Sequence, residues 1–148
     1  MFAPIALTLA LAGPVDPEQA LAEFCPASAL PAAVTGEWLN GRYRVVGYDA
    51  TRQHAYHGSL TVHGEEDSQV LQVSRQIEGQ NGHGTARMVA CGPDRVRQVE
   101  VRFNDGPSPR HLFCVLHTDY DNNHRLSCTR PVSDPAHDVE TWFQQTDG

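Results

Sequence analysis

Residues 56–63 read Tyr-His-Gly-Ser-Leu-Thr-Val-His, and their apolar side chains alternate with polar ones. Successive side chains of a strand lie on opposite faces, so Tyr56, Leu60 and Val62 would share one face and the two histidines the other. This period of two is typical of a strand with one buried face and one face in solvent.

The same pattern continues on both sides of this stretch, in short segments bounded by Gly, Pro, Asn and Asp, which are typical turn residues. Helical spacing is hard to find there. The other segments predicted as strands are 42–48, 71–77, 85–90, 99–103, 112–116, 125–130 and 137–144. Eight strands with short connections predict an all-β, antiparallel up-and-down barrel, because closure removes exposed strand edges.

The side chains expected on the inner face of this barrel are mostly apolar. They are Tyr43, Val45, Tyr56, Leu60, Val62, Leu71, Val73, Arg75, Val101, Phe103, Leu112 and Leu116. An eight-stranded barrel is just wide enough to be filled by side chains or to hold one small ligand. Two alternatives therefore stay open: these residues form a packed core, or they line a ligand-binding calyx in which Arg75 or Arg42 meets an acidic head group.

The four cysteines, Cys25, Cys91, Cys114 and Cys128, form an even set without a C-x-x-C pair, which favours disulfides over structural zinc. Four thiols allow three pairings. Cys114 and Cys128 are equidistant from a turn centred near Asp121, so they would face each other across a hairpin. This geometry favours Cys114–Cys128 and, by elimination, Cys25–Cys91, bonds that persist in an oxidising compartment.

Two motifs resemble those of the lipocalins. Gly36-Glu37-Trp38 matches the G-x-W signature that precedes the family's first strand. Thr118-Asp119-Tyr120 is similar to the T-D-Y motif between the sixth and seventh strands, with Val-Leu shortly before it and Ser127-Cys128 after it.

The resemblance implies an antiparallel calyx with Trp38 closing one end and the T-D-Y loop beside it, so that Trp38, Asp119 and Tyr120 have structural roles. The sequence departs from the family on the last strand. Lipocalins usually place an Arg there over the tryptophan, whereas this chain has Gln144 and Gln145.

The first residues, MFAPIALTLALAG, contain an apolar run at 5–12 that ends in a small-x-small triplet of the kind a signal peptidase accepts. The run is too short to span a bilayer. We interpret residues 1–22 as a signal peptide or an N-terminal helix and 23–148 as one barrel domain. This interpretation predicts a periplasmic or secreted protein without a membrane span.

Other functional classes find little support in the sequence. A net charge of −7 and the lack of a compact basic patch argue against nucleic acid as a partner. The chain has eight histidines but no H-x-x-x-H, and Asp119, Asp121 and Asn123 open a calcium-like loop that has His124 where glycine is required. No G-x-S-x-G occurs. We therefore expect no metal, no cofactor and no catalysis.

Two functions remain. The first is an exported lipocalin-like carrier of a small hydrophobic or amphipathic molecule. The second is a rigid barrel with a filled interior that binds and inhibits a protein partner, as a periplasmic inhibitor or immunity-type protein would, through loops 104–110 and 119–124. We expect a monomer in both cases, and the volume of the interior distinguishes the two.

Overall fold

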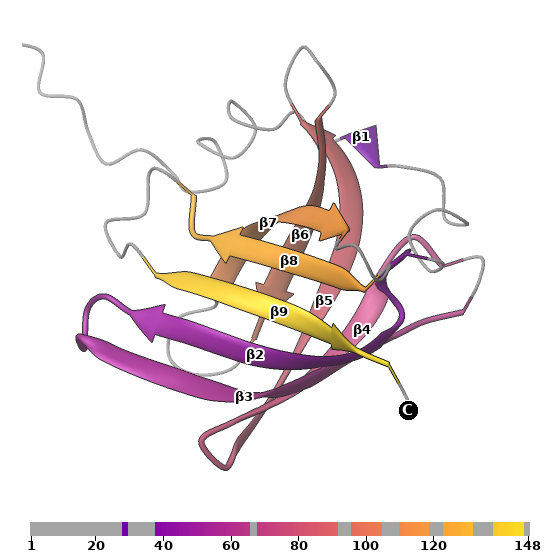
Figure 1. The fold of residues 1–148 in the computed structure, drawn as a ribbon. Coiled ribbons are helices and arrows are strands. Elements are labelled where there is room, and N and C mark those ends of the chain that lie inside the picture. Colours follow the sequence, from indigo (N-terminus) through magenta and orange to yellow (C-terminus); the bar gives the residue numbers. More distant parts are fainter. Residues whose placement is uncertain are drawn as a thin grey trace, which may run out of the picture.

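The computed structural model describes residues 28–29, 38–65, 68–91, 96–104, 110–118, 123–131 and 138–146. The strands in these ranges, labelled in Figure 1, are β1 (Ser28–Ala29), β2 (Gly41–Asp49), β3 (His54–His63), β4 (Leu71–Ile77), β5 (Gln80–Cys91), β6 (Val96–Phe103), β7 (Arg110–Thr118), β8 (His124–Thr129) and β9 (Val139–Gln145). Within the same ranges, no helix has the length and apolar character needed to cross a bilayer.

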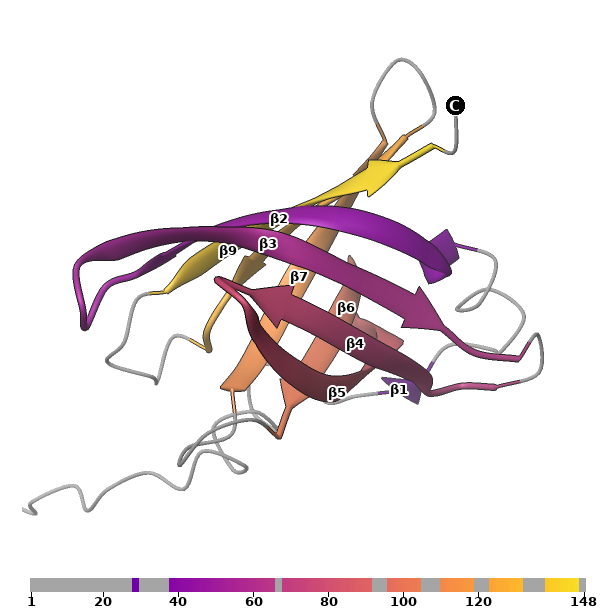
Figure 2. The same ribbon diagram turned by 90° about the horizontal axis from the view of Figure 1, so that it is seen from below.

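Strands β2 to β9 form a closed ring. Each pairs antiparallel with the next along the chain, and β9 pairs back with β2, where Trp142 lies opposite Val45. β1 lies outside the ring and pairs with β5 beyond the end of β4. Figures 1 and 2 show the strands curling around a common interior. The predicted eight-stranded, antiparallel up-and-down barrel is confirmed.

Each segment predicted as a strand overlaps one of β2 to β9, and the bounds of β5 differ most from the prediction. The alternation predicted its start at residue 85, whereas β5 begins at Gln80. Its buried positions 82 and 84 are glycines, so the first half of the strand has no apolar side chain to reveal it. Glycine is needed at 84, because a Cβ atom there would lie 2.2 Å from the carbonyl oxygen of Arg102.

The core fills the inside of the barrel. Its largest fully buried side chains include Trp142, Tyr43 and Phe103. The Trp142 ring centroid lies 5.9 Å from that of Tyr43 and 6.4 Å from that of Phe103, with tilted planes in both pairs. Such tilted packing of aromatic rings adds stability beyond the area it buries.

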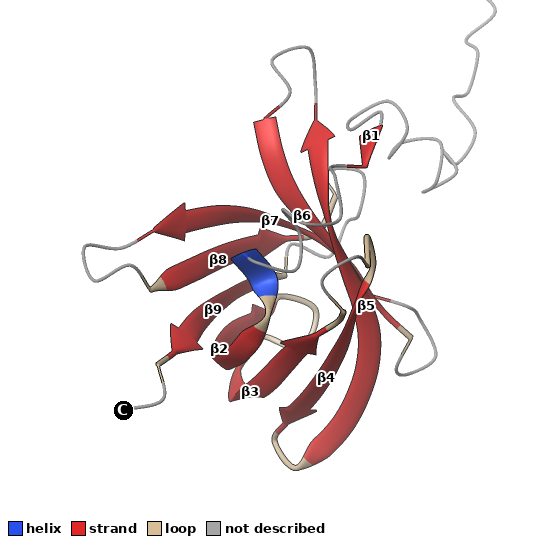
Figure 3. Cartoon of the chain, turned by 90° about the vertical axis from the view of Figure 1, so that its right-hand side faces the viewer, coloured by secondary structure: helices blue, strands red, loops and turns tan. Residues whose placement is uncertain are grey.

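A helical turn at Trp38 and Leu39 closes one end of the barrel, which we call the Leu39 end (Figure 3). The side chain inserted there is that of Leu39, which is 1% exposed, whereas Trp38 is 36% exposed and packs beside His124. Tyr43 Oη donates a 2.8 Å hydrogen bond to the carbonyl oxygen of Leu39, which holds the turn against the core. Residues Asp119 and Tyr120 lie outside the described ranges.

The predicted disulfide between Cys114 and Cys128 is confirmed. It joins β7 to β8 with a Cα–Cα distance of 3.9 Å, and both side chains are buried in the core. Cys91 is also disulfide-bonded. Cys25, its predicted partner, and the predicted signal segment 1–22 lie outside the described residues.

Candidate functional site

The side chains predicted to line a calyx all belong to the barrel's core or its edge. Eleven of the twelve are buried, and Leu116 is partly buried against the same cluster. Arg75 is among the buried ones, whereas Arg42 is exposed on the outer face of β2 and therefore does not point into the barrel.

Very little space is left between these side chains. A side chain that lines a ligand-sized void, about 300 Å³ or more, keeps part of its surface accessible to water. Tyr43, Val45 and Phe103 are 0% exposed, and so are Val99, Val101 and Trp142. The middle of the barrel is therefore packed, as in an ordinary protein core.

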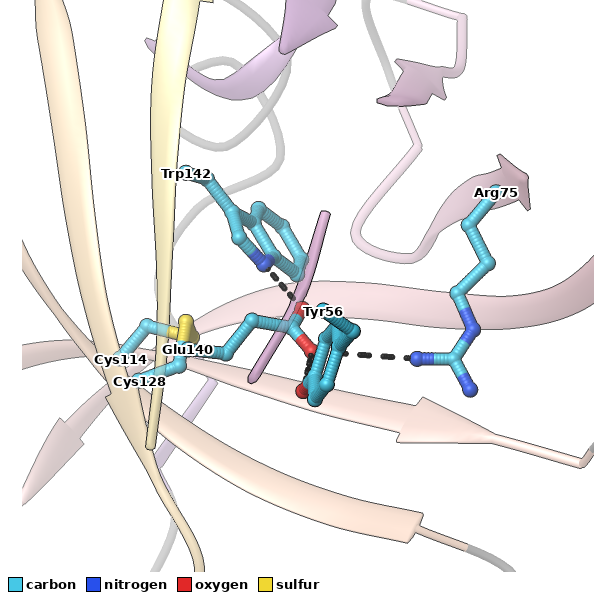
Figure 4. Close-up of a disulfide and its surroundings, with 6 residues drawn as sticks. All are labelled: Tyr56, Arg75, Cys114, Cys128, Glu140 and Trp142. Carbon is cyan, nitrogen blue, oxygen red and sulfur yellow. Dashed lines mark hydrogen bonds and ion pairs between the residues drawn. A yellow bond between two sulfur atoms is a disulfide. The ribbon is translucent and has the colours of Figure 1, made fainter. Parts of the chain in front are cut away.

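The opposite end, which we call the Glu140 end, carries a buried polar cluster (Figure 4). Glu140 is 2% exposed, and Tyr56 Oη donates a 2.7 Å hydrogen bond to its Oε2. Trp142 Nε1 donates to the other carboxylate oxygen, and Arg75 Nη1 lies 3.9 Å from Oε2. The buried carboxylate thus has donors on both oxygens and a cation beside it, which a buried charge requires.

Strand geometry explains why these groups meet. Glu140 and Trp142 are two residues apart in β9 and point to the same inner face. Tyr56 lies opposite Gly47, and its ring covers the glycine closely enough that the hydroxyl reaches Glu140. Burial, together with the charge of Glu140, raises the pKa of Tyr56, so its hydroxyl stays protonated and donates.

Further ion pairs lie at the Glu140 end of the barrel. Arg110 Nη1 lies 3.4 Å from Tyr56 Oη, and its Nη2 lies 3.5 Å from the Asp49 carboxylate. The hydrogen bond from the Arg52 backbone amide, with the nearby cations, holds the pKa of Asp49 below its ordinary value.

A second carboxylate at this end, that of Asp138, accepts hydrogen bonds from the Ala50 amide at 2.9 Å and from Arg130 at 2.8 Å. Arg110 and Arg130 at this end therefore each form an ion pair with a carboxylate of the protein.

Glu140 is not among the residues predicted from the sequence to line the barrel, and no other carboxylate is. The available signal was its position two residues before Trp142 in a predicted strand, which places both side chains on one face. Apolar neighbours on one face mark Arg75 as inward, whereas Trp142 and Phe143 lie on opposite faces of the last strand, so alternation there does not show which face Glu140 shares.

A second polar cluster lies on the outer face of β5, β6 and β7. Glu100 is 5% exposed and accepts hydrogen bonds from Arg87, Arg102 and His111. Burial alone would raise the pKa of Glu100, but these donors lower it to about 2. The cluster ties three neighbouring strands together by charge-assisted hydrogen bonds.

Among the described residues, the pairing between β6 and β7 stops short of the Leu39 end. Their pairing runs only from Val99 opposite Cys114 to Phe103 opposite Arg110. Residues 96–98 continue in β6 and pair with β5, and residues 115–118 continue in β7 and pair with β8. Figure 3 shows the two hairpins diverging. We call the two stretches 96–98 and 115–118, which do not pair with each other, the β6–β7 notch.

The described part of the chain brings no three His, Cys, Asp or Glu side chains into an arrangement that would hold a metal ion. Most of loop 104–110 and of turn 119–124, the predicted partner contacts, lies outside the described residues. Comparison with protein-family models, with curated proteins and with solved structures found no match.

Proposed function

We propose that this protein is a binding module that recognises a protein partner through its outer surface, and that its barrel serves as a rigid scaffold. The supporting observation is the packed interior: nine side chains of the barrel's core are 0% exposed. A carrier of apolar molecules needs that volume for its cargo. A rigid, filled barrel instead presents its edges and loops with little loss of conformational entropy on binding.

The polar end of the interior supports the same choice. The acidic head group of a ligand would be expected to pair with Arg75, but Glu140 lies 3.9 Å from that guanidinium and is itself buried. A second carboxylate at this position would be repelled by Glu140 and would lose its hydration. Arg75 therefore fits a structural role better than the role of a ligand anchor.

We further propose that the protein is exported and acts in the periplasm or outside the cell as an inhibitor or immunity-type protein without catalytic activity. The disulfides at Cys114–Cys128 and at Cys91 support an oxidising compartment, and the apolar run at 5–12 supports a signal peptide. The G-x-W and T-D-Y motifs, together with the barrel, support a distant relation to the lipocalins.

The interior can be tested by chemical extraction. Protein purified from an oxidising compartment is extracted with organic solvent, analysed by mass spectrometry, and titrated with an apolar fluorescent dye. We expect no molecule at one equivalent per barrel and no saturable dye signal. A retained lipid at one equivalent would contradict the proposal and restore the carrier function.

Partner recognition needs a separate experiment. The tagged protein is used to capture binding proteins from a periplasmic extract. The control is the same chain reduced and alkylated in denaturant, used after circular dichroism shows that its strand signal is lost. We expect one protein to be retained in stoichiometric amount by the folded barrel only. If the folded and unfolded chains retain the same proteins, the partner-binding function is wrong.

A further inference from the structure

We propose that the β6–β7 notch accepts an extended segment of the partner protein, which adds as a strand to the edge of β7. This inference rests on the proposed function and names the surface that carries it. Addition of a strand to an exposed sheet edge is a recurring mode of recognition, in which backbone hydrogen bonds supply affinity and side chains supply specificity.

The disulfide pair shows which backbone groups of β7 face the notch. In antiparallel sheets, directly opposite residues lie about 5.5 Å apart in hydrogen-bonded pairs and about 4.5 Å apart in non-hydrogen-bonded pairs. The Cα atoms of Cys114 and Cys128 are 3.9 Å apart, so this pair is of the second type. The N–H and C=O groups of Cys114 therefore point away from β8, toward β6.

Backbone direction alternates along a strand, so Leu116 and Thr118 direct their N–H and C=O groups to the same side as Cys114. Cys114 meets Val99 there, but Leu116 and Thr118 have no β6 residue opposite them in the described ranges. By the same alternation, Arg97 of β6 directs its backbone groups toward the notch. The notch thus presents a ladder of donors and acceptors from both of its sides.

The neighbouring edge of β5 is covered by another strand, and this contrast supports a functional role for the edge of β7. β5 also extends beyond its partner, because its pairing with β4 ends at Ala86. There β1 covers the edge by pairing with Val89 and Ala90. Exposed edges invite aggregation and are usually covered. Among the described strands, none covers the edge of β7 at 115–118 in the same way.

The side chains around the notch indicate the chemistry of the partner segment. Val96 is 51% exposed and Val115 is 42% exposed, one on each side. By alternation from the core residues Val99 and Cys114, Arg97 lies on the inner face, whereas Val96, Val115 and His117 lie on the outer face. Residues 96–99 and 113–118 include no carboxylate, in contrast to the net charge of −7 of the whole chain. A segment with apolar side chains on its outer face and acidic ones on its inner face is complementary to the two valines and to Arg97.

The lack of pairing between 96–98 and 115–118 favours a single extended segment over a second copy of the barrel. An occupant that pairs with both stretches must itself have two free edges. Strands β2 to β9 of another copy are paired with two neighbours over most of their length. A terminus or a long loop of another protein meets the requirement.

Amide hydrogen exchange tests this placement with a defined probe. We use a synthetic peptide of about eight residues alternating Val and Glu, with a Val and Arg peptide of the same length as control. We expect the acidic peptide to slow exchange at Leu116 and Thr118 by at least about tenfold, and the basic peptide to have little effect. The amides of Val115 and His117, which face β8, should not change.

Four results would overturn the inference. Protection of Leu116 and Thr118 in the free, monomeric protein would mean that the chain's own residues already occupy the notch. Protection that grows with protein concentration would assign it to a second copy. Binding of the acidic peptide at another surface, or no binding at all, would equally contradict the site.

Variants separate this surface from the proposed function. Thr118→Pro removes one edge donor without removing a bond to β8, and Arg97→Glu reverses the charge beside the notch. Arg44→Glu, on the outer face of β2, is the matched control. We expect the first two to weaken capture of the extract partner at least about tenfold and the control to leave it unchanged. If all three variants capture the partner equally, the notch is not the binding site, although the protein still binds a partner. If the unmodified protein captures nothing, the proposed partner binding is itself wrong.

Discussion

Tyr56 covers Gly47 of the neighbouring strand so closely that a Cβ atom at position 47 would lie 2.2 Å from the ring carbon Cζ. The absence of a side chain at Gly47 is thus what allows the Tyr56 hydroxyl to reach Glu140, 2.7 Å away. A backbone position in β2 thereby controls a hydrogen bond inside the barrel.

Replacement of this glycine should therefore disturb the polar cluster. We expect Gly47→Ala to displace the Tyr56 ring and lower the free energy of unfolding by about 2 kcal/mol or more, through overpacking and loss of the bond to Glu140. Urea unfolding followed by circular dichroism measures the change. Ser59→Ala, at an exposed position of β3, is the control and should change stability by less than about 0.5 kcal/mol. Equal stability of both variants would mean that the close contact has no energetic consequence.

The buried pair of Arg75 and Glu140 should behave as a coupled unit. We expect Glu140→Gln to destabilise the barrel by about 3 kcal/mol, because it removes the carboxylate charge beside the buried Arg75 guanidinium. The double variant Glu140→Gln with Arg75→Met should lose less than the sum of the two single variants. A double-mutant cycle in urea gives the coupling energy, and additive effects would show that the two charges do not interact.

Glu100 should make stability depend on acidity. Its pKa is lowered from an ordinary value of 4.5 to about 2 in the folded protein, so the folded state favours the carboxylate. The resulting stabilisation is fully present above the unfolded-state pKa and is lost as the pH falls through the folded-state pKa. The size of the shift corresponds to about 3 kcal/mol at neutral pH.

The measurement is a series of unfolding experiments between about pH 7 and pH 2 on the original protein and on Glu100→Gln. We expect the original protein to lose stability below about pH 5, and the variant to be less stable at neutral pH and to show a shallower dependence. Parallel curves for the two proteins would assign the acid sensitivity to other carboxylates.

The disulfide between Cys114 and Cys128 should stabilise the barrel without being required for its fold. The bond closes a short loop, with a sequence separation of 14. We expect the double variant Cys114→Ala, Cys128→Ala to keep the strand signal in circular dichroism and to lose about 3 kcal/mol of stability. An unchanged melting temperature would contradict this role, and a loss of the strand signal would show that the bond is needed for folding.

The strands and the disulfide between β7 and β8 were predictable because both depend on local order in the chain. Alternation at 56–63 reports the two faces of β3 directly. The positions of Cys114 and Cys128 around one turn bring them opposite each other in any hairpin built on that turn. Closure of the sheet into a barrel was predictable from the number of strands, because an open sheet would leave exposed edges that invite aggregation.

The candidate sites were decided only by the tertiary structure, because their partners are distant in sequence. Glu140 and Tyr56 are separated by 84 residues, so no local pattern pairs them. Whether the inner side chains fill the barrel depends on how their volumes fit together, which alternation does not encode. The β6–β7 notch arises where two hairpins diverge after Val99 and Cys114, and that divergence appears only when all the strands are in place.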